Sequence, residues 1–99
     1  MQTTEKSPDT EAARLAVLFK VFGDETRVKI MTALAEPDKC VSEIASPMGV
    51  SQSAVSHQLK LLKDAKLVKS EKSGRVVTYS LADDHVRTIL NMGFEHIRE

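Results

Sequence analysis

The chain has 99 residues, with 14 basic and 14 acidic side chains and one cysteine, Cys40. This length predicts one small domain with a modest core, unless the chain oligomerises. It contains no apolar run long enough to span a membrane, its polar start MQTTEKSPDTE is unlike a signal peptide, and a lone cysteine excludes an internal disulfide framework. We therefore expect a cytoplasmic protein with no membrane partner.

The zero net charge hides an uneven distribution along the chain. Residues 1–50 carry six basic and eight acidic side chains. Residues 51–79 carry six basic and two acidic side chains, and residues 80–99 carry two basic and four acidic ones. A basic centre between acidic ends is typical of a nucleic-acid module, although a solvated face of mixed charges is the alternative interpretation.

The chain order of predicted elements is four helices, two strands and a last helix. Residues 1–9 are polar and predict a flexible arm, which leaves one domain over residues 10–99. In chain order we expect helices over 11–22, 25–35, 41–48 and 52–67, strands within LVKSE and RVVTYSL, and a helix from about 84 to 99.

Several residues mark the ends of these elements. Gly23 is a stop signal for the first helix, and Asp24 and Ser51 are typical N-caps for the second and fourth. Gly74 within KSGR predicts the tip of a hairpin. Pro47 removes a backbone donor late in the third helix, so we expect that helix to be short or to end irregularly.

The stretch CVSEIASPMGVSQSAVSHQL has the layout of a helix-turn-helix. Ala45 permits close helix crossing, Gly49 permits a sharp turn, and Val55, six residues later, packs the second helix onto the first. The hairpin that follows turns the motif into a winged helix. The predicted fold class is therefore mainly α with a β-hairpin wing, in the order α-α-α-α-β-β-α.

The second helix of this motif is expected to enter the major groove of DNA. Its outward side chains face base edges, and glutamine can bond adenine with two hydrogen bonds. These side chains are Gln52, Ser53, Ser56, His57 and Lys60. Further basic residues are expected to contact phosphates, which position the protein without specifying sequence. With Lys60, they are Lys63, Lys69, Lys72 and Arg75. For His57 the alternative is an ordinary surface or capping histidine.

Three stretches carry a resemblance to the ArsR/SmtB family of metal-responsive bacterial repressors. FKVFGDETRVKIMTAL is similar to the family's second-helix signature, VSQSAVSHQLKLLKDAKLV to its recognition helix, and GRVVTYSLAD to its wing. The resemblance covers roughly residues 14–99, and Pro47 departs from it because the family usually has a helix former there. It implies a homodimeric repressor that leaves its operator DNA when an effector binds.

The last helix carries two histidines at opposite ends. His85 and His96 are eleven residues apart, or about 16 Å along a helix, which is too far for one metal ion to span. Ile89 and Met92 lie on the same stripe between them. A solvated helix would not place apolar residues there, whereas a helix packed against its own symmetry mate would.

Antiparallel pairing about a two-fold axis near Asn91 would bring opposite ends together. Each end would then gather Asp83 and His85 of one chain with His96 and Glu99 of the other, giving two symmetric sites. Asp83 must occupy an N-cap position, because inside the helix it would point away from His85. Two surface histidines at helix ends are the alternative.

Two imidazoles and two carboxylates suit tetrahedral Zn(II), with Co(II) as a plausible mimic, and the absence of thiolates argues against soft ions. The resemblance implies the same ligands, because Asp-x-His-x₁₀-His-x₂-Glu is the C-terminal-helix zinc pattern of one subgroup. It also implies a relay, in which the non-ligating nitrogen of His96 bonds a backbone carbonyl near residues 65–66.

Cys40 falls where thiolate-sensing relatives carry the first cysteine of a Cys-Val-Cys motif, but the second position is Ser42. We expect a small, mostly buried residue, with redox or soft-metal sensing as the alternative. A metal-stapled interaction module that never binds DNA is a further alternative. We expect no enzyme activity and no small organic substrate, since four protein ligands leave no open position on the metal and no nucleophile–base pair is apparent.

Overall fold

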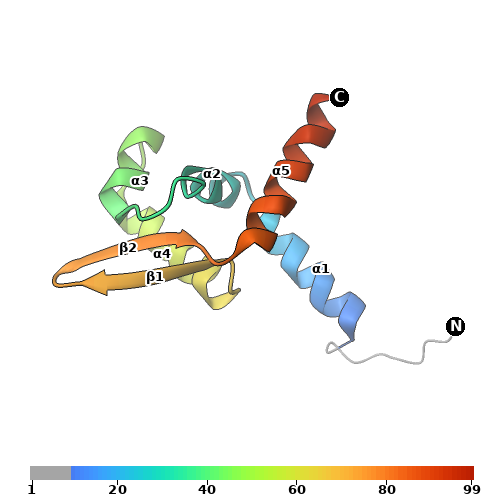
Figure 1. Ribbon diagram of the computed structural model, residues 1–99, viewed down its shortest axis with the longest axis horizontal. Helices are drawn as coiled ribbons and strands as arrows, with labels where there is room; N and C mark the ends of the chain where they lie inside the picture. The colour runs from blue at the N-terminus through green and yellow to red at the C-terminus, as the bar shows by residue number, and fades with distance from the viewer. Residues whose placement is uncertain (1–9) are drawn as a thin grey trace, which may run out of the picture.

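The computed structural model describes residues 10–99, so the predicted flexible arm over residues 1–9 lies outside the described residues. The predicted order of four helices, a hairpin and a final helix is confirmed (Figure 1). The elements are α1 (Glu11–Phe22), α2 (Glu25–Ala33), α3 (Val41–Met48), α4 (Gln52–Asp64), β1 (Val68–Ser73), β2 (Val76–Leu81) and α5 (Asp84–Arg98).

The predicted N-caps are confirmed, and each satisfies a backbone donor that the first helical turn leaves free. Asp24 accepts from the Arg27 N–H at 3.0 Å, and Ser51 accepts from the Ala54 N–H at 3.0 Å. Asp83 has extended backbone angles and accepts from the Val86 N–H at 3.3 Å. Asp83 therefore lies just outside α5, as the predicted metal site requires.

Of the two alternatives expected from Pro47, a short helix is found, because α3 has eight residues, whereas an irregular end is not. The helix α3 continues through Pro47 to Met48, and Gly49 then takes a left-handed conformation with a φ of 68°. The Gly49 N–H bonds the Ser46 carbonyl at 3.2 Å, an ordinary closure for a helix C-terminus. The proline is tolerated because it stands in the last turn, where the loss of one donor does not break a continuing ladder.

The hairpin extends away from the helices as the predicted wing (Figure 1). Strands β1 and β2 pair antiparallel from Val68 opposite Leu81 to Ser73 opposite Val76, with Gly74 at a φ of 64° in the turn. The segment between α2 and α3 forms an isolated β-bridge with β2, which the sequence did not predict. Lys39 and Tyr79 exchange backbone hydrogen bonds of 3.1 and 2.8 Å.

The core lies between α2, α3, α4 and the base of the hairpin, and α5 contributes only its first turns to it. Its fully buried members are Ile30, Met31, Leu34, Ile44, Val55, Leu59 and Leu62. By contrast, α1 buries none of its residues. Figure 1 shows α1 and α5 projecting from the side of the molecule away from the wing. None of the described helices has the length and apolar character needed to cross a membrane.

Candidate functional site

The helix-turn-helix is formed by α3 and α4, and α4 buries one face against the core. Val55, Leu59 and Leu62 are 0–1% exposed, whereas Ser56, His57, Lys60 and Leu61 face solvent and Gln58 is half-buried. The outward side chains predicted to face DNA bases are all exposed: Gln52, Ser53, Ser56, His57 and Lys60. The structure therefore presents them together on one accessible face of the helix.

The basic residues predicted to contact phosphates are also exposed, but two of them have partners within the chain. The Lys60 ammonium lies 3.6 Å from the Asp64 carboxylate, one turn further along α4. Lys63 donates to the Ser70 hydroxyl at 2.7 Å and so joins α4 to β1. Lys69, Lys72 and Arg75 lie exposed on the hairpin. A phosphate would have to compete with Asp64 and Ser70 for the first two lysines.

Gln58 lies on the opposite side of α4 and was not identified from the sequence. It accepts a hydrogen bond from the Arg27 Nη1 atom at 3.3 Å, and the Arg27 Nε atom donates to the Val21 carbonyl at 2.9 Å. One guanidinium thus joins α1, α2 and α4 and holds the recognition helix against the corner between α1 and α2. Gln58 is 31 residues from Arg27, so spacing along the chain could not reveal the contact.

The four predicted metal ligands lie at the two ends of α5. The His85 Nδ1 atom is 3.6 Å from the Asp83 Oδ1 atom, and their side chains are 92% and 54% exposed. His96 and Glu99 are exposed at the other end of the same helix. Among residues 10–99 of one chain, no three His, Cys, Asp or Glu side chains gather where a metal could bind. Within one chain the four predicted ligands therefore remain divided between the two ends of α5.

An apolar groove lies between α1 and α5. It has a volume of about 280 Å³ and is lined by Phe19, Phe22, Val28, Ile89, Leu90, Gly93, Phe94 and Ile97. Phe19 is 54% exposed, Met92 is 58% exposed and Ile97 is 74% exposed. Large apolar side chains that remain this exposed on adjoining helices mark a surface for association.

Cys40 is only half-buried, which corrects the expectation of a mostly buried residue. It stands at the N-cap of α3, where its Sγ atom is 3.2 Å from the Ser42 hydroxyl oxygen. The Cys40 N–H donates to the Glu43 carboxylate at 2.9 Å. This hydrogen bond holds the pKa of Glu43 below its ordinary value, since it favours the charged carboxylate. The capping role explains why the thiol remains near the surface.

Comparisons with known proteins agree with this arrangement. Residues 24–70 match the arsR family of bacterial regulatory proteins. A transcriptional repressor SmtB homologue from Synechocystis is 43% identical over 90% of this chain and 67% of its own. A homologue of the cadmium resistance regulatory protein CadC from Staphylococcus aureus is 41% identical over 86% of this chain and 71% of its own.

A solved structure from Mycobacterium bovis shows the same fold. It is a homodimeric winged helix-turn-helix DNA-binding domain, described as a possible ArsR-family regulator. The two chains superpose with a TM-score of 0.85 at 22% identity, over 100% of this chain and 92% of that one. The relatives are regulators and not enzymes, which confirms the expectation of no enzyme activity. The chain belongs to the arsR family of bacterial regulatory proteins and is a winged helix-turn-helix transcriptional regulator.

Proposed function

We propose that the protein is a homodimeric repressor that binds operator DNA through α4 and the β1–β2 wing. Zn(II), or Co(II) in its place, releases it from DNA by filling two sites shared between the α5 helices of the two protomers. The placement of the ligands carries this proposal. Asp83 and His85 lie together at one end of an exposed helix, and His96 and Glu99 lie at the other.

The second protomer is needed because neither pair of ligands can hold a metal alone. Structural zinc sites take four ligands in tetrahedral geometry, and each end of α5 offers two. The apolar residues between the ends support antiparallel pairing, since Met92 and Ile97 are more than half exposed in a single chain. The homodimeric M. bovis relative has the same fold and supports the same assembly here. A two-fold axis would place two identical sites at opposite ends of the interface.

The donor set suits a metal of intermediate softness. Two imidazoles and two carboxylates match Zn(II) or Co(II), whereas copper(I) prefers thiolates and thioethers. All four side chains are at the surface, so they could close on an ion without unpacking the core. The bound ion would supply a cross-link between the two protomers.

Release of the operator requires the metal to distinguish between two states of the dimer. A ligand shifts an equilibrium only by its difference in affinity for the two states, so zinc must bind the DNA-incompetent dimer more tightly. Because α5 would lie at the dimer interface, cross-linking it would alter the spacing or mobility of the two recognition helices.

A mixed dimer tests the shared sites. One protomer carries His85→Ala and its partner carries His96→Ala, so that both lost ligands fall in the same site while the other site stays whole. Zinc titration should find one tight site in the mixed dimer, two in the wild type and none in either pure variant dimer. If the mixed dimer instead shows two damaged sites, each site lies within one chain and the proposed geometry is wrong.

The DNA surface is tested by comparing wing and helix variants. Lys72→Ala and Arg75→Ala should weaken binding to all sequences alike and flatten the dependence of affinity on salt, because phosphate contacts release counterions. Gln52→Ala should instead alter base preference at one or two operator positions. Unchanged affinity and salt dependence in the wing variants would contradict the proposed DNA surface.

Cys40 supports a second candidate, in which the same DNA-binding protein senses thiol oxidation or a soft metal. The observation in its favour is that the sulfur is only half-buried and lies 3.2 Å from the Ser42 hydroxyl. Cys40→Ser separates the two proposals. The zinc response should persist in this variant if α5 holds the metal, and should disappear if the thiol is the sensor.

A further inference from the structure

We infer that Arg87 is a positioning residue that couples the metal-bearing end of α5 to the helix-turn-helix through the α2–α3 connection. The inference rests on the proposed function, since it concerns how an event at the α5 sites reaches the DNA surface.

Arg87 lies in the second half of the first turn of α5, two residues after His85 and four after Asp83. The Arg87 Nη1 atom donates to the Ala35 carbonyl at 2.9 Å, a contact between residues 52 apart in the chain. Ala35 follows the end of α2, and the last turn of α2 contains no basic residue. A cation is favoured at a helix C-terminus, and α5 supplies it.

The contact lies between two clefts, both of which Arg87 lines. One has a volume of about 580 Å³ and includes Asp38 and Asp83, and the other has a volume of about 450 Å³ and includes Ala35 and Leu90. Close apolar packing does not fill the space on either side of the guanidinium. Val86 and Leu90 join the first turns of α5 to the core, and Arg87 adds a polar contact that reaches the α2–α3 connection directly. A movement of the first turn of α5 would therefore be transmitted to this connection through Arg87.

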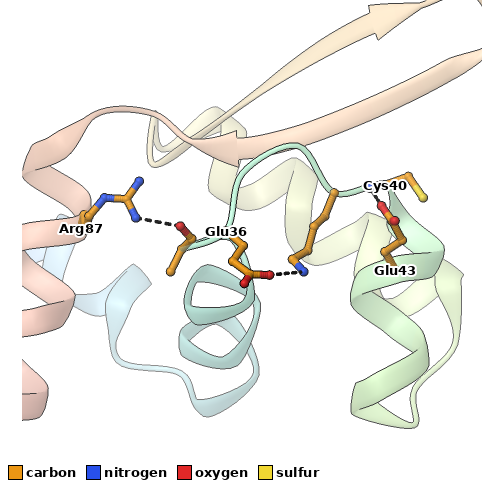
Figure 2. Close-up of polar contacts among 6 residues, drawn as sticks. Glu36, Cys40, Glu43 and Arg87 are labelled. Atoms are coloured by element: carbon orange, nitrogen blue, oxygen red, sulfur yellow. Dashed lines mark hydrogen bonds and ion pairs between the residues drawn. The ribbon is translucent and has the colours of Figure 1, made fainter.

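From Ala35 a series of contacts leads to the start of α3, as Figure 2 shows. The Lys39 ammonium lies 3.3 Å from the Glu36 carboxylate. The Lys39 backbone is paired with Tyr79 of β2, and the Cys40 N–H donates to Glu43 in the first turn of α3. Asp38, which lies between Glu36 and Lys39 in the chain, has a φ of 63°, a conformation that few non-glycine residues adopt.

The connection is therefore fixed at three points: to α5 by Arg87, to the wing by Lys39, and to α3 by Glu43. A constraint on Asp83 and His85 reaches Arg87 within one helical turn. Through Ala35 and the short connection it then reaches α3, which packs directly on the recognition helix α4. Both parts of the DNA surface, helix and wing, are joined to this one segment.

The test compares operator affinity with and without zinc in three chains. These are the wild type, Arg87→Met, and Lys29→Met as a matched control that removes one positive charge from an exposed ion pair on α2. Fluorescence anisotropy gives the ratio of the two operator dissociation constants, and this ratio measures the coupling. Metal-free operator affinity, zinc affinity and thermal stability are measured on the same samples.

We expect Arg87→Met to lower the coupling ratio at least about fivefold, while zinc affinity without DNA and operator affinity without zinc stay near wild-type values. Lys29→Met should leave the ratio unchanged. Because linkage is reciprocal, the weakening of zinc binding that operator DNA causes should shrink by the same factor in Arg87→Met. An unchanged ratio in Arg87→Met would overturn the inference, as would a loss of metal-free DNA binding with the ratio preserved.

A second variant tests the connection itself without altering α5. Pro37→Gly makes the α2–α3 connection more flexible and should also lower the ratio. If both changes interrupt one route, the coupling ratio of the double variant should be little lower than that of Arg87→Met alone. Additive losses of coupling would contradict a shared route. Zinc-independent operator binding by the wild-type chain would overturn the proposed function itself and this inference with it. By contrast, if the wild type responds to zinc and Arg87→Met responds equally, only this inference is overturned and the proposed function stands.

Discussion

Ile97 is the residue whose replacement should most directly weaken the proposed dimer. It is 74% exposed in the single chain, the largest exposed fraction among the large apolar side chains of residues 10–99. It lines the groove between α1 and α5, next to His96 near the end of the helix. In an antiparallel pair of α5 helices, each Ile97 would pack on the start of the partner's helix.

The expected loss in the free energy of dimer association follows from the area of Ile97 that a single chain leaves exposed. Ile97→Ala removes three carbons, each contributing about 0.8 kcal/mol when fully buried. About three quarters of the side chain is still exposed in the protomer, so each copy should contribute about 1.8 kcal/mol to association. Two symmetric copies give about 3.5 kcal/mol, a weakening of the dimer dissociation constant by several hundredfold.

Sedimentation equilibrium of the metal-free protein over a range of concentrations measures this constant. Val76→Ala is the control, because Val76 is 54% exposed but lies on the wing, away from α1 and α5. A cooperative urea unfolding transition should show that the core of α2 to α4 remains folded in both variants. A dimer constant unchanged in Ile97→Ala, or weakened equally in Val76→Ala, would refute the assignment of this groove to the interface.

Three further predictions concern the core and pH. Leu62→Ala should lower the free energy of unfolding by about 2–5 kcal/mol in urea denaturation at fixed protein concentration, and by more than Leu61→Ala, because the two residues are 0% and 39% exposed. Because the pKa of Glu43 is lowered in the folded protein, its charged carboxylate stabilises the fold at pH values above 4.5, the ordinary pKa of the group. This contribution is lost as the pH falls through the lower pKa of the folded state. The difference in melting temperature between wild type and Glu43→Gln should therefore shrink below that pH, and a constant difference would contradict the assignment. Zinc affinity, measured by competition with a chelator, should fall as pH is lowered, since imidazole binds a metal only in its neutral form, and a flat profile would exclude imidazole ligands.

The fold could be predicted largely because the starts of its helices are set by local chemistry, whereas the predicted ends of α2 and α4 were two and three residues too late. Asp24, Ser51 and Asp83 each cap a helix by bonding a backbone N–H three residues ahead, a pattern that is visible in the sequence. The buried side chains of α4 repeat at helical spacing, and Gly74 marks the hairpin turn. Such features depend on residues within one turn of each other, so they need no knowledge of the tertiary structure.

The contacts that were missed join distant parts of the chain. Arg87 bonds Ala35, Arg27 bonds Gln58, and Lys39 pairs with Tyr79. Each depends on how the elements pack, and an exposed arginine or lysine has no local pattern that names its partner. The same limit applies to Lys63, whose bond to Ser70 crosses the turn between α4 and β1.

The candidate metal site also has a part that depends on local sequence and a part that depends on distant contacts. The position of Asp83 as an N-cap beside His85 is local, and the structure confirms it. The joining of this pair to His96 and Glu99 depends on a second chain, and it stays a prediction. A general rule about proline within helices predicted a short third helix or an irregular end at Pro47. The helix α3 is short, but its end is regular because Pro47 stands in the last turn.

Because α1 is exposed in the single chain, we expect the folding of this helix to depend on the protein concentration. Within one chain α1 buries no residue, and an isolated helix of twelve residues is marginal in water. Leu18, Val21 and Phe22 pack partly on the core, and in the proposed dimer the partner would cover more of α1. Dilution should therefore loosen α1 together with the dimer, and the melting temperature should rise with concentration. Newly made subunits at low abundance would expose α1 to proteases, whereas paired subunits would be protected. The cell would then retain assembled repressor and remove unpaired chains.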